Sequence, residues 1–388
     1  MSERENAIYQ RSNSMLVSNF LKRYAIIIAL VCVWIIFAAV TSGVFVAPRN
    51  LSNLMMQLSV IGVLSVGMTV LLLTGNFDLS VGSVVGMTGL IAAQLITNNN
   101  YSPVIAIIIV LIIGIVVGAW QGFLIAYRKL PSFVATLAGM IIFRGVTLVL
   151  ANGYAIPIQD ERFLFLGSEY IPPTLGYIIA AVIIAVYIIL FFRKRVLARR
   201  NNFVPVPIRK QLLPFIGIIA GIIVFVFVMN LYQGIPLILV FLIVLAALFS
   251  LILNKTRFGK YVYAIGGNIE AAKISGINVK KNLFVCFTLM GLLSALAGIM
   301  LAARLGNTTN NAGLLYEMDT ISACIIGGVS LTGGLGKISN AIIGTVLIMS
   351  LSNGMSLLNI NTMTQAVVRG VVFIIAVWFD VKYRVKRA

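Results

Sequence analysis

The sequence has no histidine, few acidic residues and few cysteines. It holds 10 Asp and Glu residues against 29 Lys and Arg residues. Without histidine, only cysteines, carboxylates and lysines remain for acid–base chemistry or metal binding. The three cysteines, Cys32, Cys286 and Cys324, lie in separate apolar runs, which argues against a disulfide or metal framework. We therefore expect no catalytic residue, no metal site and no cofactor.

Charged residues of either sign are scarce, and apolar residues dominate. Sixty per cent of the 388 residues are hydrophobic, 10% are charged, and the mean hydropathy is +1.06. No soluble domain has this composition. The first apolar run begins near Tyr24 and is too long for the core of a signal peptide. The sequence therefore predicts an all-α, polytopic membrane protein without a cleavable signal.

The apolar runs predict about ten transmembrane helices, at roughly 20 residues a span. The expected spans cover about 24–42, 53–74, 78–96, 103–127, 133–150, 174–192, 212–229, 235–253, 283–303 and 363–379. The runs 318–331 and 340–358 form either a re-entrant hairpin or two more crossings, which would make twelve; we favour the hairpin. Gly114 and Gly118, four residues apart, predict close helix packing.

The basic residues gather in segments that fall on one side of the predicted membrane. These are residues 1–23, the turn at Arg128 and Lys129, the stretch 193–210, the loop 254–281 and the tail 381–388. Basic segments remain on the cytoplasmic side of a membrane. Both termini are therefore expected in the cytoplasm, around a transmembrane domain over 24–380. This placement accounts for the net charge of +19 without a nucleic-acid partner.

The loop 254–281 is the longest polar interruption in the second half of the chain. Within it, a short helix is expected over 269–275. Asn268 can cap its first turn, Glu270 suits the positive end of the helix dipole, and Gly276 can end it. Two helical turns are not stable alone in water. We expect the helix to dock into a soluble partner; the alternative is a basic loop lying on lipid headgroups.

Four long blocks of this sequence resemble the permeases of ribose/xylose-type ABC sugar importers. They are TGNFDLSVGSVVGM (74–87), YRKLPSFVATLAGMIIFRG (127–145), FGKYVYAIGGNIEAAKISGI (258–277) and MDTISACIIGGVSLTGGLGKI (318–338). The resemblance covers nearly the whole chain. The spacing around YRKLPSF and the ending MTQAVVRGVVFIIAVWFD are most similar to the xylose-type branch.

This resemblance implies a function and a set of partners. The chain would be the inner-membrane permease subunit that moves a monosaccharide, xylose or a related aldose, into a bacterial cell. It would work with a second permease copy, an ATP-binding ABC subunit and an extracytoplasmic sugar-binding protein. The resemblance also implies the residues that couple the permease to the ATPase: Gly266, Gly267, Asn268, Glu270, Ala271, Ala272, Lys273, Ser275 and Gly276.

Polar residues within two predicted helix breaks are candidates for the translocation path. The first break holds Asn76, Asp78, Ser80 and Ser83, and the second holds Ser330 and Thr332, with Ser322 before it. Non-helical backbone at membrane depth must be buried in protein or line a wet cavity. The alternative for Asp78 is a cap on a helix over 79–96.

Two arginines lie inside apolar runs, where a charge is costly unless it is paired or hydrated. The two arginines are Arg144 and Arg369, and their candidate partners are Glu317 and Asp319. A pair that fixes helix packing is a simpler interpretation than contact with a substrate.

One glycine-rich stretch, GGLGKIS (333–339), is similar to a phosphate-binding loop but departs from its pattern. Leu331 stands where that pattern needs Gly, and Ile338 where it needs Ser or Thr. We expect no nucleotide site here, so an ATP-driven transporter needs ATP on another chain. The rival interpretations are an ion-coupled secondary transporter, which would bind its ion through a carboxylate such as Asp78, and a membrane-embedded enzyme.

Overall fold

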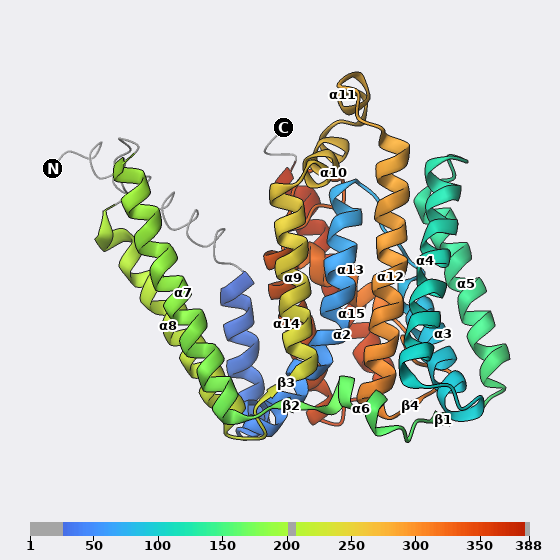
Figure 1. Ribbon diagram of the computed structural model, residues 1–388, viewed down its shortest axis with the longest axis horizontal. Coiled ribbons are helices and arrows are strands. Elements are labelled where there is room, and N and C mark those ends of the chain that lie inside the picture. The colour runs from blue at the N-terminus through green and yellow to red at the C-terminus, as the bar shows by residue number, and fades with distance from the viewer. Residues whose placement is uncertain (1–25, 201–206, 385–388) are drawn as a thin grey trace, which may run out of the picture.

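A computed structural model describes residues 26–200 and 207–384 of the chain (Figure 1). The predicted N-terminal segment 1–23 lies outside the described residues. The predicted tail 381–388 is described only to Arg384, where the last helix ends.

Long apolar helices make up most of the structure, which confirms the all-α, polytopic membrane fold. Nine helices among the described residues are long and apolar enough to cross a membrane. They are α2 (Pro48–Leu73), α3 (Val81–Ala93) with its π-helical extension η2 (Gln94–Asn98), α4 (Pro103–Ala126), α5 (Ser132–Ala151), α7 (Pro173–Arg200), α8 (Ile208–Asn230), α9 (Leu237–Lys255), α12 (Val279–Leu305) and α14 (Ile338–Leu357). Two shorter apolar helices, Ile26–Val40 and the first part of α15 (Thr362–Arg384), fall on the first and last predicted spans.

The two ends of the helix bundle differ. One end carries the short helices α10 (Arg257–Gly267) and α11 (Ile269–Ile274), and we call it the α11 end (Figure 1). The opposite end carries η1 (Val44–Val46), α6 (Glu161–Ser168) and two small antiparallel pairs of strands. Strand β1 (Ile156–Pro157) pairs with β4 (Asn307–Thr308), and β2 (Tyr170–Ile171) pairs with β3 (Ile235–Pro236).

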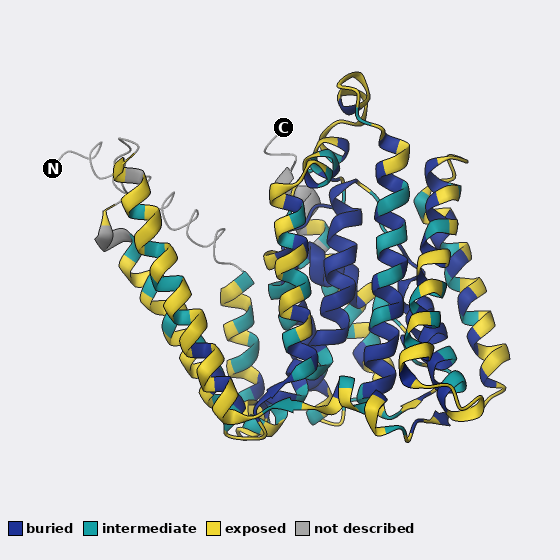
Figure 2. Cartoon of the chain, viewed as in Figure 1, coloured by how far each residue is buried: buried dark blue, intermediate teal, exposed yellow. Residues whose placement is uncertain are grey.

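Helix α2 lies in the core of the bundle, and the helices around it bury most of its side chains (Figure 2). Beside it, α4 and α12 pack with their backbones in contact. A Cβ atom at Gly114 would lie 2.6 Å from the carbonyl oxygen of Gly291, and one at Gly118 would overlap that of Phe287. This is the close approach that the glycine spacing predicts.

The α7–α8 hairpin stands apart from this body, and most of its apolar side chains are exposed (Figure 2). A helix that is apolar on all sides suits a lipid environment. The hairpin therefore belongs to the lipid-facing periphery.

The two predicted helix breaks are present. Residues 74–80 separate α2 from α3, and residues 327–337 separate α13 (Tyr316–Ile326) from α14. Helix α13 has 11 residues and spans about 16 Å, too short to cross a membrane alone. It packs antiparallel to α14, so that a Cβ atom at Gly327 would lie 2.7 Å from the carbonyl carbon of Asn340. The two helices form a hairpin whose tip reaches the end of α2, where the Gly334 amide donates to the Leu73 carbonyl at 2.9 Å. Helix α14 by itself is long enough to cross a membrane, which does not fit the favoured re-entrant hairpin, in which neither run crosses.

Candidate functional site

Helix α11 is built as the sequence predicts, one residue shorter at its end. The side-chain oxygen of Asn268 accepts hydrogen bonds from the amides of Glu270 and Ala271, both at 3.0 Å. Lys273 forms an exposed ion pair with Glu270 at 2.7 Å. Gly276 follows the helix with a φ of 79°, the left-handed conformation that favours glycine. The ends of the helix are therefore set by residues of the loop itself.

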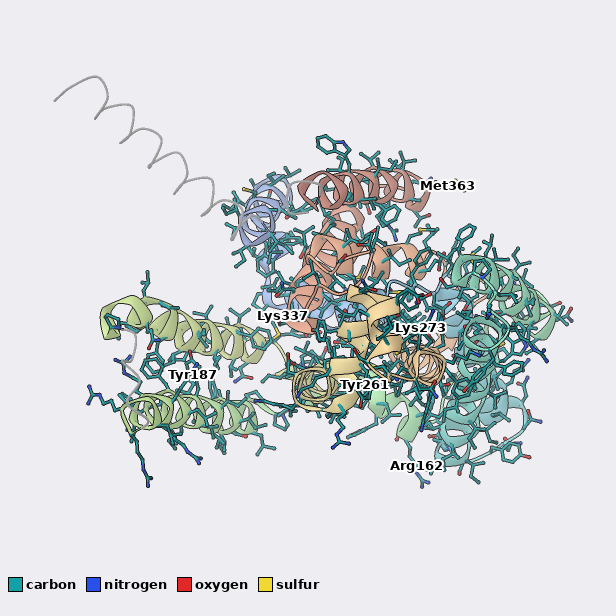
Figure 3. The ribbon with its side chains drawn as sticks, turned by 90° about the horizontal axis from the view of Figure 1, so that it is seen from above. Arg162, Tyr187, Tyr261, Lys273, Lys337 and Met363 are labelled. Carbon is teal, nitrogen blue, oxygen red and sulfur yellow. The ribbon has the colours of Figure 1, made fainter. Side chains whose placement is uncertain are left out.

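Most of α11 is open to solvent. Ala272 is its one buried residue, packed in a small apolar cluster with Ala126, Ile265, Val279 and Leu283. Ile274, by contrast, is 87% exposed, and Ile269 is also exposed. In the view onto the α11 end, Lys273 and Tyr261 lie over the middle of the bundle (Figure 3). The helix presents an apolar tip above the membrane body.

The preceding helix, α10, is packed onto that body. A Cβ atom at Gly266 would overlap the carbonyl oxygen of Leu73, at the end of α2. The Tyr263 hydroxyl donates to the carbonyl oxygen of Gly336 at 2.9 Å. Burial raises the pKa of this phenol above its ordinary value, and a phenol is protonated at neutral pH even without that shift. Gly267, which follows Gly266 in the chain, is exposed, and a Cβ atom there would contact nothing within 4 Å.

The predicted coupling residues therefore occupy two environments. Gly266 and Ala272 are held against the body. The others lie on the exposed side of the 254–281 loop: Gly267, Asn268, Glu270, Ala271, Lys273, Ser275 and Gly276.

At the first break, the Asp78 side chain is hydrogen-bonded to Ser80, two residues further along the chain. One carboxylate oxygen accepts from the amide and the hydroxyl of Ser80, both at 2.7 Å. Helix α3 begins at Val81, so the expected helix start at residue 79 is wrong: this turn occupies residues 78–80. The contacts favour the structural interpretation of Asp78, which holds the turn into α3.

The Gln121 side chain of α4 donates to the Ser80 hydroxyl at 2.7 Å. Both residues are buried, as is Ser83 one turn further along α3. Sequence reasoning missed Gln121. Gln121 could have been found as the side-chain amide within an otherwise apolar span, because an unsatisfied polar group there is costly.

At the second break, Ser330 and Thr332 lie together at the hairpin tip. The Ser330 hydroxyl accepts a hydrogen bond from the Thr332 amide at 3.2 Å. At the first break, the Asn76 side-chain amide donates to the Thr74 carbonyl oxygen at 3.2 Å. A Cβ atom at Gly75 would lie 3.4 Å from the Thr332 carbonyl oxygen. The structure thus brings the two breaks into contact although some 250 residues separate them. The candidate path residues form two groups: Asn76, Ser330 and Thr332 near the tip, and Asp78, Ser80 and Ser83 at the start of α3. Ser322 is buried within α13.

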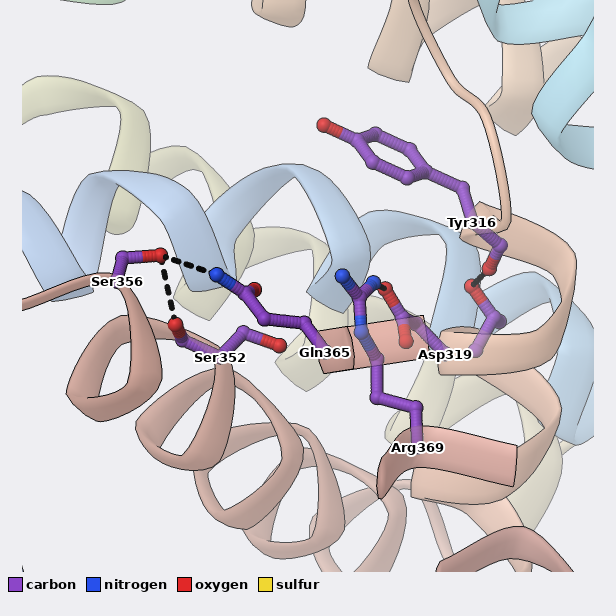
Figure 4. A network of polar contacts seen from close by, with 7 residues as sticks. Tyr316, Asp319, Ser352, Ser356, Gln365 and Arg369 are labelled. Atoms are coloured by element: carbon purple, nitrogen blue, oxygen red, sulfur yellow. Dashed lines mark hydrogen bonds and ion pairs between the residues drawn. The ribbon is translucent and has the colours of Figure 1, made fainter. Parts of the chain in front are cut away.

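Of the two membrane arginines, Arg369 has the expected partner. It forms an ion pair with Asp319 at 2.8 Å, which joins α15 to α13 (Figure 4). The side chains of Asp319 and Arg369 are 3% and 19% exposed. Arg144 instead donates to the carbonyl oxygens of Asn310 and Ala312, both at 3.1 Å. Among the described residues it forms no ion pair, although the charge of Glu317 lies near enough to attract it.

Comparison with known proteins identifies relatives over almost the whole chain. A family model described as "Branched-chain amino acid transport system / permease component" matches residues 50–377. The xylose transport system permease protein XylH of Escherichia coli (strain K12) is 36% identical over 366 residues, 93% of this chain and 92% of that protein. The ribose import permease protein RbsC of Bacillus subtilis (strain 168) is 35% identical over 348 residues, 90% of this chain and 89% of that protein. No solved structure matches the chain.

The matched regions contain both helix breaks and the 254–281 loop. The match to the xylose permeases covers more of the chain than the match to the ribose permeases. The chain therefore belongs to the ribose/xylose-type permease family of ABC sugar importers, and it stands nearest to the xylose-type branch.

Proposed function

We propose that this chain is the membrane-spanning subunit of a binding-protein-dependent ABC importer. It would carry a monosaccharide, xylose or a related aldose, into the cytoplasm, while a separate chain hydrolyses ATP. The observation that carries the proposal is 36% identity to a xylose permease over 93% of the chain. A match of this extent includes the membrane body, both breaks and the α10–α11 region together.

Helix α11 supports the coupling part of the proposal. It is too short to be stable alone, and it carries at its tip an isoleucine, Ile274, whose side chain is 87% exposed. All six basic residues of the 254–281 loop are exposed, as suits the cytoplasmic side of a membrane. An apolar tip flanked by charges fits a groove on a soluble partner, which here is the ATP-binding subunit.

The assembly would contain two copies of this chain, two ATP-binding subunits and an extracytoplasmic sugar-binding protein. The ATPases approach each other on binding ATP and move α11, and the permease changes between outward-open and inward-open states. A ligand shifts such a balance only through its difference in affinity for the two states. Sugar selection would therefore rest mostly with the sugar-binding protein. The two groups of polar residues at the breaks would line the path.

A specific observation keeps the ion-coupled transporter as a second candidate. Glu317 is a buried carboxylate, 6% exposed, that forms no ion pair among the described residues. Intramembrane carboxylates of this kind carry ions or protons in secondary transporters. Asp78 and Asp319 are less suited to that role. The Asp78 carboxylate already accepts hydrogen bonds from Ser80, and the Asp319 carboxylate is in an ion pair with Arg369.

Uptake of labelled pentoses and hexoses tests the proposal. Cells that lack this chain are compared with the same cells carrying it and with cells carrying Gly276→Pro. Gly276 has a positive φ, which proline cannot adopt, so this change disrupts α11 beyond the membrane. We expect the intact chain to restore uptake of xylose or a related aldose, and Gly276→Pro to be inserted but inactive. Uptake that is independent of the chain for every sugar would contradict the proposal.

A further inference from the structure

Three segments that are far apart in the sequence meet at the α11 end of the bundle. They are the end of α2 with the first break (73–75), the last residues of α10 (263–267) and the hairpin tip (330–336). Two hydrogen bonds join them: Gly334 donates to Leu73, and Tyr263 donates to Gly336, both at 2.9 Å. We call this contact the glycine junction.

The backbones in the glycine junction touch without side chains between them. A Cβ atom at Gly333 would lie 2.8 Å from the Cα atom of Gly266 and 2.9 Å from the amide nitrogen of Gly75. A Cβ atom at Gly266 would lie 2.6 Å from the Gly334 amide nitrogen and would overlap the Leu73 carbonyl. Real Cβ atoms do not approach backbone this closely, so any side chain here would push the segments apart.

Gly75, Gly333 and Gly334 also have positive φ angles, of 76°, 93° and 73°. An L-residue adopts this conformation only with strain. Two independent requirements, space and backbone conformation, therefore keep the junction a direct contact between main chains.

The junction lies next to the proposed docking helix. A single residue, Asn268, separates Gly267 at the end of α10 from the start of α11. The other attachments of α11 are the small apolar cluster around Ala272 and the short link to α12 over residues 275–278. A displacement of α11 is therefore passed directly to the end of α10, and Gly266 cannot move without displacing the end of α2 or the hairpin tip.

From this geometry we infer that the glycine junction is the mechanical link between the ATP-binding subunit and the two membrane breaks, with Gly266 and Tyr263 as its positioning residues. The inference rests on the proposed function and adds to it the place where motion enters the membrane. Both breaks move together because the end of α10 contacts both of them. Since one break holds Asn76 and the other holds Ser330 and Thr332, the same motion rearranges the polar groups on both sides of the contact.

The chain offers a control outside both the junction and the docking loop. Gly221 lies in α8, and an added methyl group there would meet open space, whereas one at Gly266 would overlap backbone. Gly221→Ala therefore makes the same chemical change without entering the junction or the proposed docking surface.

The experiment uses the full complex in vesicles, with the ATP-binding subunit and the sugar-binding protein. Sugar uptake and sugar-stimulated ATP hydrolysis are measured together for wild type, Gly266→Ala, Gly221→Ala and Tyr263→Phe. Retention of the ATP-binding subunit is checked for each variant. We expect Gly266→Ala to lower the sugar transported per ATP by about tenfold or more, because an overpacked contact must open. Tyr263→Phe should lower it by about fivefold, the effect of one lost hydrogen bond, and Gly221→Ala should match wild type.

Two results would overturn the inference. One is an unchanged ratio of sugar to ATP in both Gly266→Ala and Tyr263→Phe, and the other is equal damage from Gly221→Ala and Gly266→Ala. If Gly266→Ala does not reach the membrane, Tyr263→Phe decides alone, since it removes one oxygen atom and adds no volume. Wild-type uptake that needs no ATP-binding subunit would refute the proposed function instead, so the two failures are distinguishable.

Discussion

Two ion pairs of nearly the same length lie in opposite surroundings within the part of the chain that the structure describes. Asp319 and Arg369 meet at 2.8 Å between α13 and α15, and their side chains are 3% and 19% exposed. Glu270 and Lys273 meet at 2.7 Å on α11, where their side chains are 70% and 53% exposed. The distance between the charges therefore says little about what each pair contributes.

The surroundings explain the difference. A buried charge that loses its partner is left in a low-dielectric interior at high cost. An exposed pair exchanges its contact for water with little change in free energy. The contact between α13 and α15 thus depends on two buried charges, each of which is costly without the other. Helix α11, in contrast, is held mainly by its cap and by Ala272. A region with so little stability of its own is suited to being ordered by a partner.

The largest expected effect follows from breaking the interior pair. Arg369→Leu leaves the Asp319 carboxylate buried without its counter-charge and should destabilise the protein by about 3–5 kcal/mol. The measurement is the thermal unfolding temperature of the purified chain in detergent. The double variant Asp319→Leu with Arg369→Leu removes both charges and should recover most of the loss. Equal instability of the single and double variants would show that lost packing, not charge, causes the effect.

A smaller and different effect is expected at the apolar tip of α11. Ile274→Asp should leave the unfolding temperature unchanged, because the side chain is 87% exposed and such surface changes usually stay within about 0.5 kcal/mol. Binding of the ATP-binding subunit should fall by about tenfold or more, as for an interface anchor. The matched control Ile274→Leu should bind normally. Normal binding by Ile274→Asp would remove Ile274 from the docking surface.

The smallest effect is expected from the exposed pair itself. Glu270→Gln keeps the size of the side chain and removes its charge. It should leave the unfolding temperature unchanged and alter the affinity for the ATP-binding subunit by no more than about twofold. The same two assays measure it. A large loss of binding with unchanged unfolding would mean that the Glu270 carboxylate contacts the partner directly.

Features determined by neighbouring residues could be predicted from the sequence. The Asn268 cap, the Gly276 end and the long apolar helices each depend on a local pattern, and the structure contains all of them. The short run ending at Leu331 predicts a segment that cannot cross a membrane alone, as α13 is found to be. The re-entrant hairpin favoured for 318–358 does not fit α14, which is long enough to cross.

Contacts between distant segments could not be predicted. The pattern around Thr332 and Gly333 indicates a break but not that Gly75 and Gly266 lie against it. The side chains of Asn50 and Asn353 likewise hydrogen-bond to each other at 2.8 Å across about 300 residues. Such pairings depend on how the helices assemble, and no local periodicity encodes them. For the same reason Gln121 was missed, since its role depends on the position of Ser80.

Dependence on a separate ATP-hydrolysing chain is the central claim of this account. The most direct test reconstitutes the purified chain in vesicles, with and without the ATP-binding subunit and the sugar-binding protein, and follows labelled xylose under ATP or under a sodium or proton gradient. We predict that sugar accumulates only when both partners and ATP are present. Accumulation by the chain alone under an ion gradient would contradict the account and favour an ion-coupled transporter that uses Glu317.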